Sequence, residues 1–466
     1  ASVNTEGRKR PTVTRGDPKK DKFFPKITIV GTVKGIESTI TLEPVTELSR
    51  IQEDRAPQPS TLSASPERIH EPIRLARYVM ATQYYKKKDW AHAADHFEAL
   101  IQEGMSQSIH ERDLHMYAGY SNYHRSFAKD PKDFLLKAKN PFLSAQQSYE
   151  KTEKDSNYPF VLNMLGTIYT FTGFTGSSFE EAEKLLTEAS KLWKEGGDEK
   201  SSCLAQGNLG AYYWGIAARN INTQQNIERG IRVLEKLLNE HCNTAEYFVD
   251  RNNLGYLYLK KSDDSPTPTT DLQQAVKHFL SVTEHGKTRS PWSDYIAREN
   301  GLARSYAGLI RLGVDVKVNL SKCITAYEEV AAIYDEHKFS EKYADVRMQM
   351  ARSYTDAAQK GIDFSENMTR AISKLKGAST YYKDLKQWAK YAEAQSHLVL
   401  SYRELAQHDI DRSVNLLQMK LVLEDGIVLL HKHGLSGEER KFKETLESLN
   451  KFLSDEAKRQ RKLPPI

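Results

Sequence analysis

One short pattern recurs along most of this chain and constrains its fold more than any other feature. The pattern is an apolar residue followed by a compact residue and, three positions later, a tyrosine. Its tyrosines are Tyr84, Tyr169, Tyr213, Tyr258, Tyr306, Tyr354 and Tyr402, and a degenerate copy ends at Tyr123. Successive tyrosines lie 39, 46, 44, 45, 48, 48 and 48 residues apart. Such a period is typical of an array of repeated structural units.

A second apolar pattern follows each copy of the first. Three residues recur at i, i+4 and i+7, for example Ala182, Leu186 and Ala189. This spacing places them on one face of an α-helix. The compact residue of the first pattern allows this second helix to approach closely. A single hairpin cannot bury both faces, so the sequence predicts a stack of helical hairpins.

These residues resemble the tetratricopeptide repeat (TPR) family, whose pattern is W-x-x-L-G-x-x-Y followed by A-x-x-x-F-x-x-A. The resemblance is closest in the first copy, where Trp90 occupies the mid-hairpin aromatic position of the family. The repeats here are longer than the usual TPR length of about 34 residues, which implies longer helices or loops. The resemblance implies an all-α solenoid of about eight TPR-like hairpins over residues 70–435.

The ends of the chain differ from this array. Residues 1–25 are polar and basic and are predicted to be a disordered tail. Alternating apolar residues predict a small β-hairpin extension over residues 26–46, and a Pro/Ser-rich linker follows over residues 47–69. Ser436 and Glu439 predict a capping box at the start of a C-terminal capping helix, which with a basic tail occupies residues 436–466. The packed face of that helix is predicted to contain Leu446, Leu449, Phe452 and Leu453.

Composition narrows the class of protein. The 67 basic and 62 acidic residues leave a net charge of +5, which does not require a nucleic-acid partner. No run approaches the about 18–20 apolar residues of a membrane span. The dispersed Cys203, Cys242 and Cys323 are expected to be reduced, and we expect a soluble, cytoplasmic protein. A processed organelle protein is the alternative, because the chain begins at Ala1.

The sequence contains no catalytic signature. There is no phosphate-binding loop, no nucleophile elbow and no ligand-spaced cysteine cluster, so we expect no enzyme activity, no cofactor and no metal. His92 and His96 share a helix face and could ligate zinc. Because they lie beside the predicted buried face of Ala93, Phe97 and Leu100, we expect a structural role instead.

The TPR resemblance implies a binding groove lined by the first helix of each hairpin. Asparagines recur just before the compact residue, at Asn163, Asn208, Asn252, Asn253 and Asn300. An amide side chain can donate to and accept from a peptide backbone, so a ladder of asparagines suits an extended peptide. The alternative is that these amides join neighbouring helices.

Toward the C-terminus an arginine follows the compact residue, at Arg304 and Arg352, and Arg403 lies one turn later in the last repeat. If they face inward, these arginines would make that part of the groove basic, and Trp214 and Tyr256 would supply aromatic contacts. The alternative is that they are ordinary exposed arginines. The sequence therefore predicts a scaffold, adaptor or sensor module within a larger complex, holding an extended or helical segment of a partner protein. RNA binding in the same basic, aromatic-lined groove is the alternative.

Overall fold

The computed structural model places most of the helical region of the chain. It describes residues 12–15, 27–33, 36–42, 67–103, 111–125, 131–151, 155, 157–172, 178–221, 223–240, 247–281 and 292–461. The chain forms two compact units. The N-terminal unit is Ala1–Ile221 with Arg232–Tyr247, and the C-terminal unit is Asn222–Ile231 with Phe248–Ile466.

Three short strands precede the helices. β1 (Thr12–Arg15), β2 (Ile27–Val33) and β3 (Ile36–Leu42) pair antiparallel in that order, with Ile29 opposite Ile40. β2 and β3 fall within residues 26–46, and β1 falls within residues 1–25. The side chains of these strands lie outside the described part of the chain.

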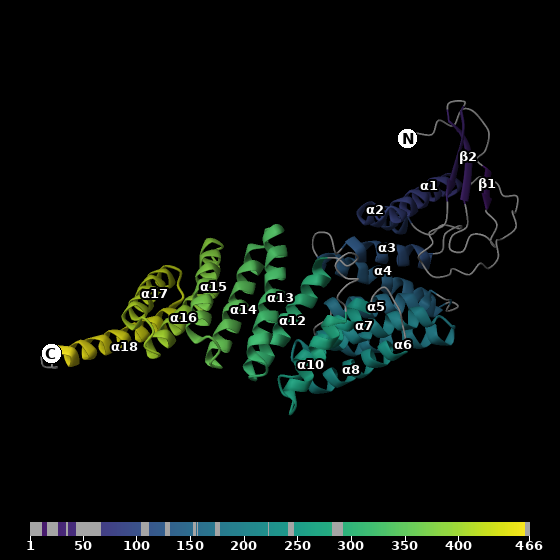
Figure 1. The fold of residues 1–466 in the computed structure, drawn as a ribbon. Coiled ribbons are helices and arrows are strands. Elements are labelled where there is room, and N and C mark those ends of the chain that lie inside the picture. Colours follow the sequence, from purple (N-terminus) through teal and green to yellow (C-terminus); the bar gives the residue numbers. More distant parts are fainter. Residues whose placement is uncertain are drawn as a thin grey trace. The chain divides into compact units, whose positions relative to one another are not determined.

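The helices of the N-terminal unit pack in chain order, each against the next, from α1 to α7 (Figure 1). Their bounds are α1 Glu67–Lys86, α2 Trp90–Gln102, α3 Glu111–Arg125, α4 Pro131–Lys151, α5 Tyr158–Thr172, α6 Ser178–Glu195 and α7 Glu199–Ala217. α8 (Thr223–Asn239) follows and spans the boundary between the two units.

The compact residue of the repeat pattern lies at the closest approach of two helices, as predicted. A methyl group added to Gly210 on α7 would come within 2.3 Å of the Leu234 side chain on α8. Gly166 on α5 meets Leu186 on α6 in the same way. Leu186 and Leu234 are the i+4 residues of the second pattern, and both are fully buried. The two sequence patterns are therefore the two sides of one helix contact.

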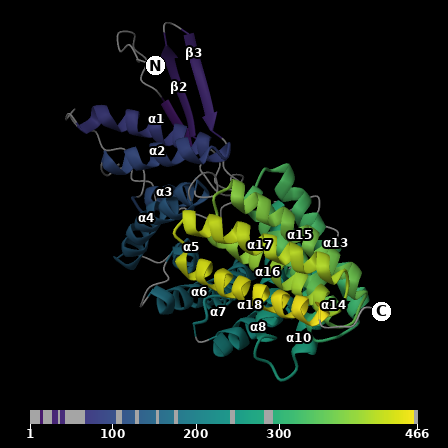
Figure 2. The ribbon, with the colours of Figure 1, turned by 90° about the vertical axis from the view of Figure 1, so that its left-hand side faces the viewer.

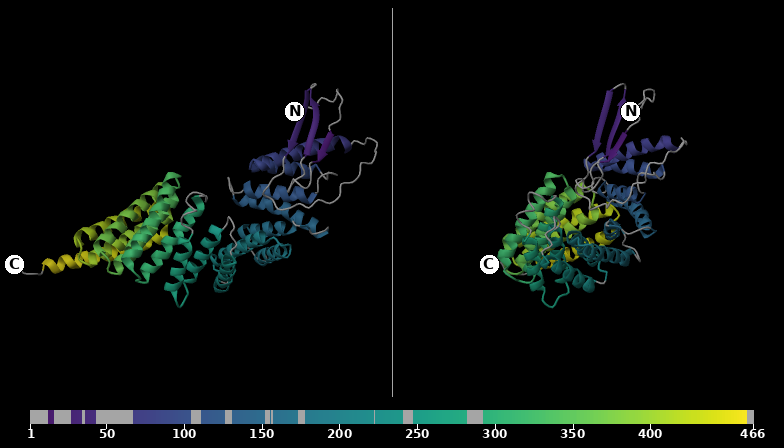
Figure 3. Two further views of the ribbon diagram at one scale, coloured as in Figure 1. Left: turned by 45° about the vertical axis from the view of Figure 1, so that its right-hand side comes forward. Right: turned by 90° about the vertical axis from the view of Figure 1, so that its right-hand side faces the viewer.

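The C-terminal unit also consists of helices. Their bounds are α9 Tyr247–Lys261, α10 Pro268–Leu280, α12 Trp292–Arg311, α13 Val316–Glu336, α14 Ser340–Gln359, α15 Phe364–Asp384, α16 Trp388–Gln407, α17 Arg412–Lys432 and α18 Ser436–Arg461. From α12 to α17 they alternate between 20 and 21 residues. The period of 48 residues therefore reflects long helices and short turns, not long loops. The green-to-yellow helices stack side by side in Figure 3.

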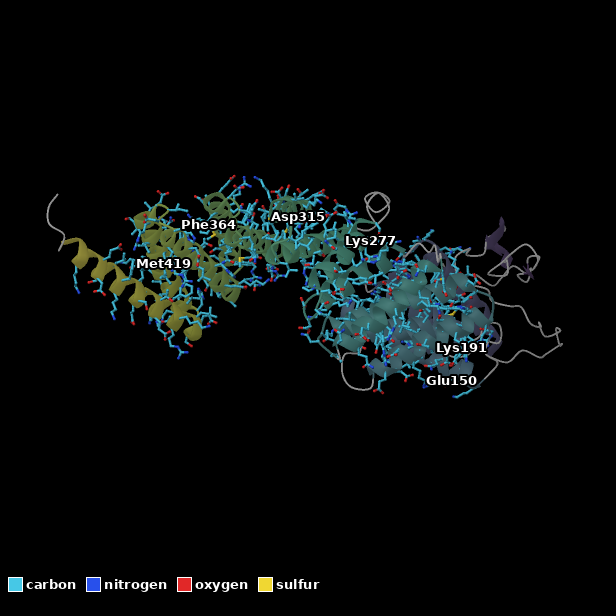
Figure 4. The ribbon with its side chains drawn as sticks, turned by 60° about the horizontal axis from the view of Figure 1, so that its bottom comes forward. Glu150, Lys191, Lys277, Asp315, Phe364 and Met419 are labelled. Carbon is cyan, nitrogen blue, oxygen red and sulfur yellow. The ribbon has the colours of Figure 1, made fainter. Side chains whose placement is uncertain are left out.

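A repeated turn joins the two helices of each of these hairpins. Asp315, Asp363 and Asp411 precede α13, α15 and α17 with positive φ angles of 38°, 40° and 38°. Four residues later an asparagine side chain donates back to the carbonyl before the aspartate, and Asn367 does so to Ile362 at 2.8 Å. Two of these turns lie along one edge of the unit, near the labelled Asp315 and Phe364 (Figure 4). The three hairpins therefore share the same turn.

α18 covers the last hairpin. It packs against α17 (Figure 2). The Phe442 side chain of α18 lies against Gly426 of α17. Leu449 is buried and Leu446 and Leu453 are partly buried, as predicted, whereas Phe452 is 45% exposed. The prediction that Phe452 belongs to the packed face is therefore wrong. The predicted capping box is also wrong, because Ser436 is already the first residue of the helix.

The cysteines differ in their oxidation state. Cys323 is buried and free, and its thiol donates to the Ser353 hydroxyl at 3.3 Å. Cys203, in contrast, is disulfide-bonded. The prediction that all three cysteines are reduced is wrong for Cys203, because widely spaced cysteines can still meet in the folded chain. Cys242 lies outside the described residues.

Among the described residues, no helix is both long and apolar enough to cross a membrane. The helical region is all-α, and within each unit most successive helices pack against each other.

Candidate functional site

A hollow of about 310 Å³ opens between α14, α15 and α16 in the C-terminal unit. Ala351, Met368 and Leu375 contribute buried apolar surface, and Leu400 contributes an exposed apolar side chain. The polar lining residues are Arg352, Thr355, Asp356, Gln359, His397, Ser401, Arg403 and Glu404. The hollow therefore combines an apolar base with charged groups of both signs.

The 48-residue period explains why these residues meet. α14 and α16 are the first helices of successive hairpins, so residues 48 apart occupy equivalent positions. Thr355 is thus equivalent to Arg403, and Asp356 to Glu404. Residues three and four apart on a helix share a face, which brings Arg352 to the same side as Thr355 and Asp356.

The charges around the hollow partly compensate each other. Arg352 on α14 forms an ion pair with Glu393 on α16. Burial raises the pKa of Asp356, and the nearby Arg311, Arg352 and Lys360 act in the opposite direction.

His397 behaves as a neutral group at this site. Burial lowers the pKa of His397, and Arg352 lowers it further, while Glu393 raises it. The ring is therefore uncharged at neutral pH. The hollow then presents the charges of two arginines and two carboxylates, so it favours neither a strong anion nor a strong cation.

Two of the predicted arginines meet here and the third does not. Arg352 and Arg403 both line the hollow. Arg304 lies on α12 and is exposed, and its charge acts on Tyr256 and Tyr327.

Asn163 and Asn208 bond to each other. The Nδ2 of Asn208 on α7 donates to the Oδ1 of Asn163 on α5 at 2.9 Å, and Asn163 is only 2% exposed. This bond joins the first helices of successive hairpins. It supports the helix-joining interpretation for these two residues over direct contact with a peptide.

The remaining predicted groove residues lie on α7, α9 and α12. The Tyr256 hydroxyl on α9 donates to the Ala297 carbonyl on α12, and burial raises its pKa to about 12. Asn300 hydrogen-bonds the Tyr334 hydroxyl. Trp214 and Asn253 are half-buried, and Asn252 is buried. These side chains take part in helix packing more than in an open surface.

The two histidines of the first hairpin flank a tyrosine. The rings of His92 and His96 both stack on Tyr84, with centroid distances of 5.0 and 5.4 Å. His92 also contacts the Asp89 carboxylate at 2.8 Å. Within the described ranges, no three His, Cys, Asp or Glu side chains cluster as a metal site would require.

Three charged or titratable residues of the hollow were missed by the sequence analysis: Asp356, His397 and Glu404. A usable signal was present, because Asp356 lies one helical turn after Arg352, and Glu404 follows Arg403. A comparison of every position on one helix face with the position 48 residues away, and not of a single position alone, would have identified these three residues.

No family model and no curated protein matches this chain. Solved structures match it at low similarity. A signal transduction ATPase with a tetratricopeptide repeat sensor, from Pyrococcus horikoshii, is 15% identical with a TM-score of 0.41, and the match covers 80% of this chain and 54% of that one. A Rap protein complexed with competence and sporulation factor is 13% identical with a TM-score of 0.34, covering 82% and 99%.

A human IFIT1 dimer with m7Gppp-AAAA is 13% identical with a TM-score of 0.31, covering 78% of this chain and 84% of that one. The chain spans about half the length of the first of these proteins. Similarity at this level is too low to indicate a shared function.

Proposed function

We propose that this chain is a protein-binding module that holds a segment of a partner protein against the first helices of its hairpins. In this proposal α1 to α17 form eight TPR-like hairpins, α18 caps them, and the module is a cytoplasmic scaffold, adaptor or sensor without enzyme activity or cofactor. The observation that supports it is the hollow between α14, α15 and α16. Its volume of about 310 Å³ lies at the lower end of the range for ligand sites, which is about 300–1,000 Å³.

The lining indicates what kind of group the hollow accepts. The apolar base of Met368 and Leu375 suits the apolar part of one large side chain of the partner. The surrounding arginines and carboxylates can then pair with polar groups on either side of it. A single anchoring side chain with flanking polar contacts is typical of peptide recognition.

The same lining disfavours the RNA alternative. Asp356 and Glu404 would face a phosphate backbone, and like charges in close contact weaken binding. Arg352 is already paired with Glu393. A site selected for polyanions would be expected to carry uncompensated cations.

The test begins with a partner recovered by affinity purification and mapped to a binding segment on overlapping peptides. We expect Leu400→Asp and Arg403→Ala each to weaken binding of that segment by about tenfold or more, measured by fluorescence anisotropy. Arg370→Ala is the matched control, since Arg370 on α15 pairs with Glu366 and does not line the hollow. Unchanged affinity for both hollow variants would exclude this site.

A fluorescent RNA titrated across a salt series separates the two proposals. Submicromolar RNA binding that falls steeply with salt, and that is lost with Arg304→Glu and Arg352→Glu, would replace the protein-binding proposal with RNA binding.

A further inference from the structure

The carboxylate of Asp356 provides an unused hydrogen-bond acceptor in the hollow. Asp356 is half-buried on α14, and among the described residues no group donates a hydrogen bond to its carboxylate. Arg352, one helical turn earlier on α14, pairs with Glu393 instead. A carboxylate that has lost part of its water is stabilised when a ligand donates a hydrogen bond to it. The hollow therefore favours a ligand that carries a donor.

This donor is expected to be uncharged. Three cations already act on the Asp356 carboxylate, and they are Arg311, Arg352 and Lys360. A cationic ligand would add a fourth positive charge beside them. An anionic ligand would instead lie close to the carboxylates of Asp356 and Glu404, which both line the hollow. A neutral donor avoids both repulsions.

Arg403 provides a donor on the neighbouring first helix, α16. It is exposed, it lines the hollow, and within the described helices it has no ion-pair partner. Arg403 is equivalent to Thr355, the residue directly before Asp356. Arg403 and Asp356 therefore lie at neighbouring levels on adjacent first helices. A hydroxyl group placed between them can donate to Asp356 and accept from Arg403.

The remaining lining favours an aromatic body for the ligand. Met368 and Leu375 contribute buried apolar surface, and a thioether such as that of Met368 contacts aromatic rings favourably. His397 adds a neutral imidazole ring. The planar guanidinium of Arg403 also stacks on aromatic faces. An aromatic ring therefore suits this lining better than an aliphatic chain does.

Tyrosine has all of these properties. Phenylalanine has no polar group, tryptophan only donates, and histidine becomes cationic near pH 6.5. We propose that the hollow receives a tyrosine side chain of the partner segment, whose hydroxyl donates to Asp356 and accepts from Arg403. This inference rests on the proposed function, because the tyrosine belongs to the segment that the module holds.

Blocked amino-acid amides test the preference for tyrosine on the full chain. By ligand-detected NMR titration, we expect N-acetyltyrosinamide to bind about tenfold or more tightly than N-acetylphenylalaninamide, because only the phenol bonds to a charged acceptor. The corresponding phosphotyrosine and lysine amides should bind more weakly than the tyrosine amide, because each brings a charge of the kind that the hollow repels. Equal affinity of the tyrosine and phenylalanine amides, no binding of the tyrosine amide, or tighter binding of either charged amide overturns the inference.

Two variants assign the preference to the hollow. Asp356→Ala should reduce the ratio of the tyrosine and phenylalanine affinities to about one, because the acceptor is lost and the ring contacts remain. Arg403→Ala, at an exposed position, should lower the same ratio. Asp384→Ala is the matched control, since Asp384 is an exposed aspartate at the end of α15 that does not line the hollow. A ratio that either hollow variant leaves unchanged overturns the inference.

The mapped partner segment separates this inference from the proposed function. Replacing its tyrosine with phenylalanine should weaken binding about tenfold. If Leu400→Asp weakens binding of the segment but this replacement does not, the hollow holds another side chain, so the inference is overturned and the proposed function stands. If Leu400→Asp leaves binding of the segment unchanged, the proposed function fails, whatever the affinity for the tyrosine amide.

Discussion

At the scale of single residues, three equivalent turn positions differ in how well their side chain suits the backbone. Positions 338, 386 and 434 lie 48 residues apart and have φ angles of 59°, 58° and 73°. The third is glycine, and the first two are Lys338 and Lys386. A side chain with a Cβ atom is strained in this left-handed region, whereas glycine is not.

We therefore expect Lys386→Gly to stabilise the protein by about 0.5–1 kcal/mol, and Lys338→Gly by a similar amount. The reverse change, Gly434→Lys, should destabilise it by about as much. Urea unfolding monitored by circular dichroism measures all three. If Lys386→Gly instead lowers the free energy of unfolding, the contacts of the lysine side chain stabilise the protein by more than the backbone strain destabilises it.

At the scale of helices, the distance between the two helices of a hairpin depends on one compact residue. Gly210 on α7 leaves no room for a methyl group against Leu234 of α8. Gly215 lies one and a half turns further along α7, and a methyl group there would meet its nearest side-chain atom, the Nη1 of Arg219, at 3.6 Å, an ordinary contact. The two glycines therefore form a matched pair on one helix.

Gly210→Ala should lower the free energy of unfolding by about 1–3 kcal/mol, because the helices must separate or Leu234 must leave its rotamer. Gly215→Ala should be neutral or stabilising by up to about 1 kcal/mol, because alanine favours the helix. Chemical denaturation of both variants makes the comparison. Equal effects of the two changes would show that helix propensity, and not packing, decides stability at these sites.

At the scale of the whole molecule, each unit contains a histidine that burial keeps neutral. Burial lowers the pKa of His124 in the N-terminal unit and of His278 in the C-terminal unit, in each case to about 4. Nearby cations add to the effect, from Lys88 at His124 and from Arg251 and Lys277 at His278. In an unfolded chain both rings would bind a proton near pH 6.5.

Acid should therefore destabilise both units. Above pH 6.5 both states leave the rings neutral, and as the pH falls from 6.5 toward 4 only the unfolded state gains protons, so stability is lost over this window. The loss is at most about 3 kcal/mol for His278 and less for the half-buried His124. Melting temperatures between pH 7.5 and 4 measure it, and His278→Gln should flatten the slope. A slope that this change leaves unaltered would assign the acid sensitivity to other groups.

Some features of this protein follow from local spacing alone. The period, the helix pairs and the buried residues could be predicted because a side chain three or four positions away lies on the same helix face whatever the rest of the chain does. Ala182, Leu186 and Ala189 illustrate this, since all three were predicted to share one helix face and all are buried. The compact residues at the helix contacts, such as Gly210, could be predicted for the same reason.

Only the tertiary structure decided which polar groups meet. The bond between Asn163 and Asn208 joins residues 45 apart, and spacing could not show whether their amides point toward each other or toward a ligand. The sequence likewise identified Arg352 and Arg403, but not the hollow that they share with His397. Local periodicity determines the face of a helix that a residue occupies, whereas the partner of a polar side chain depends on the distance and direction between separate helices, which only packing determines.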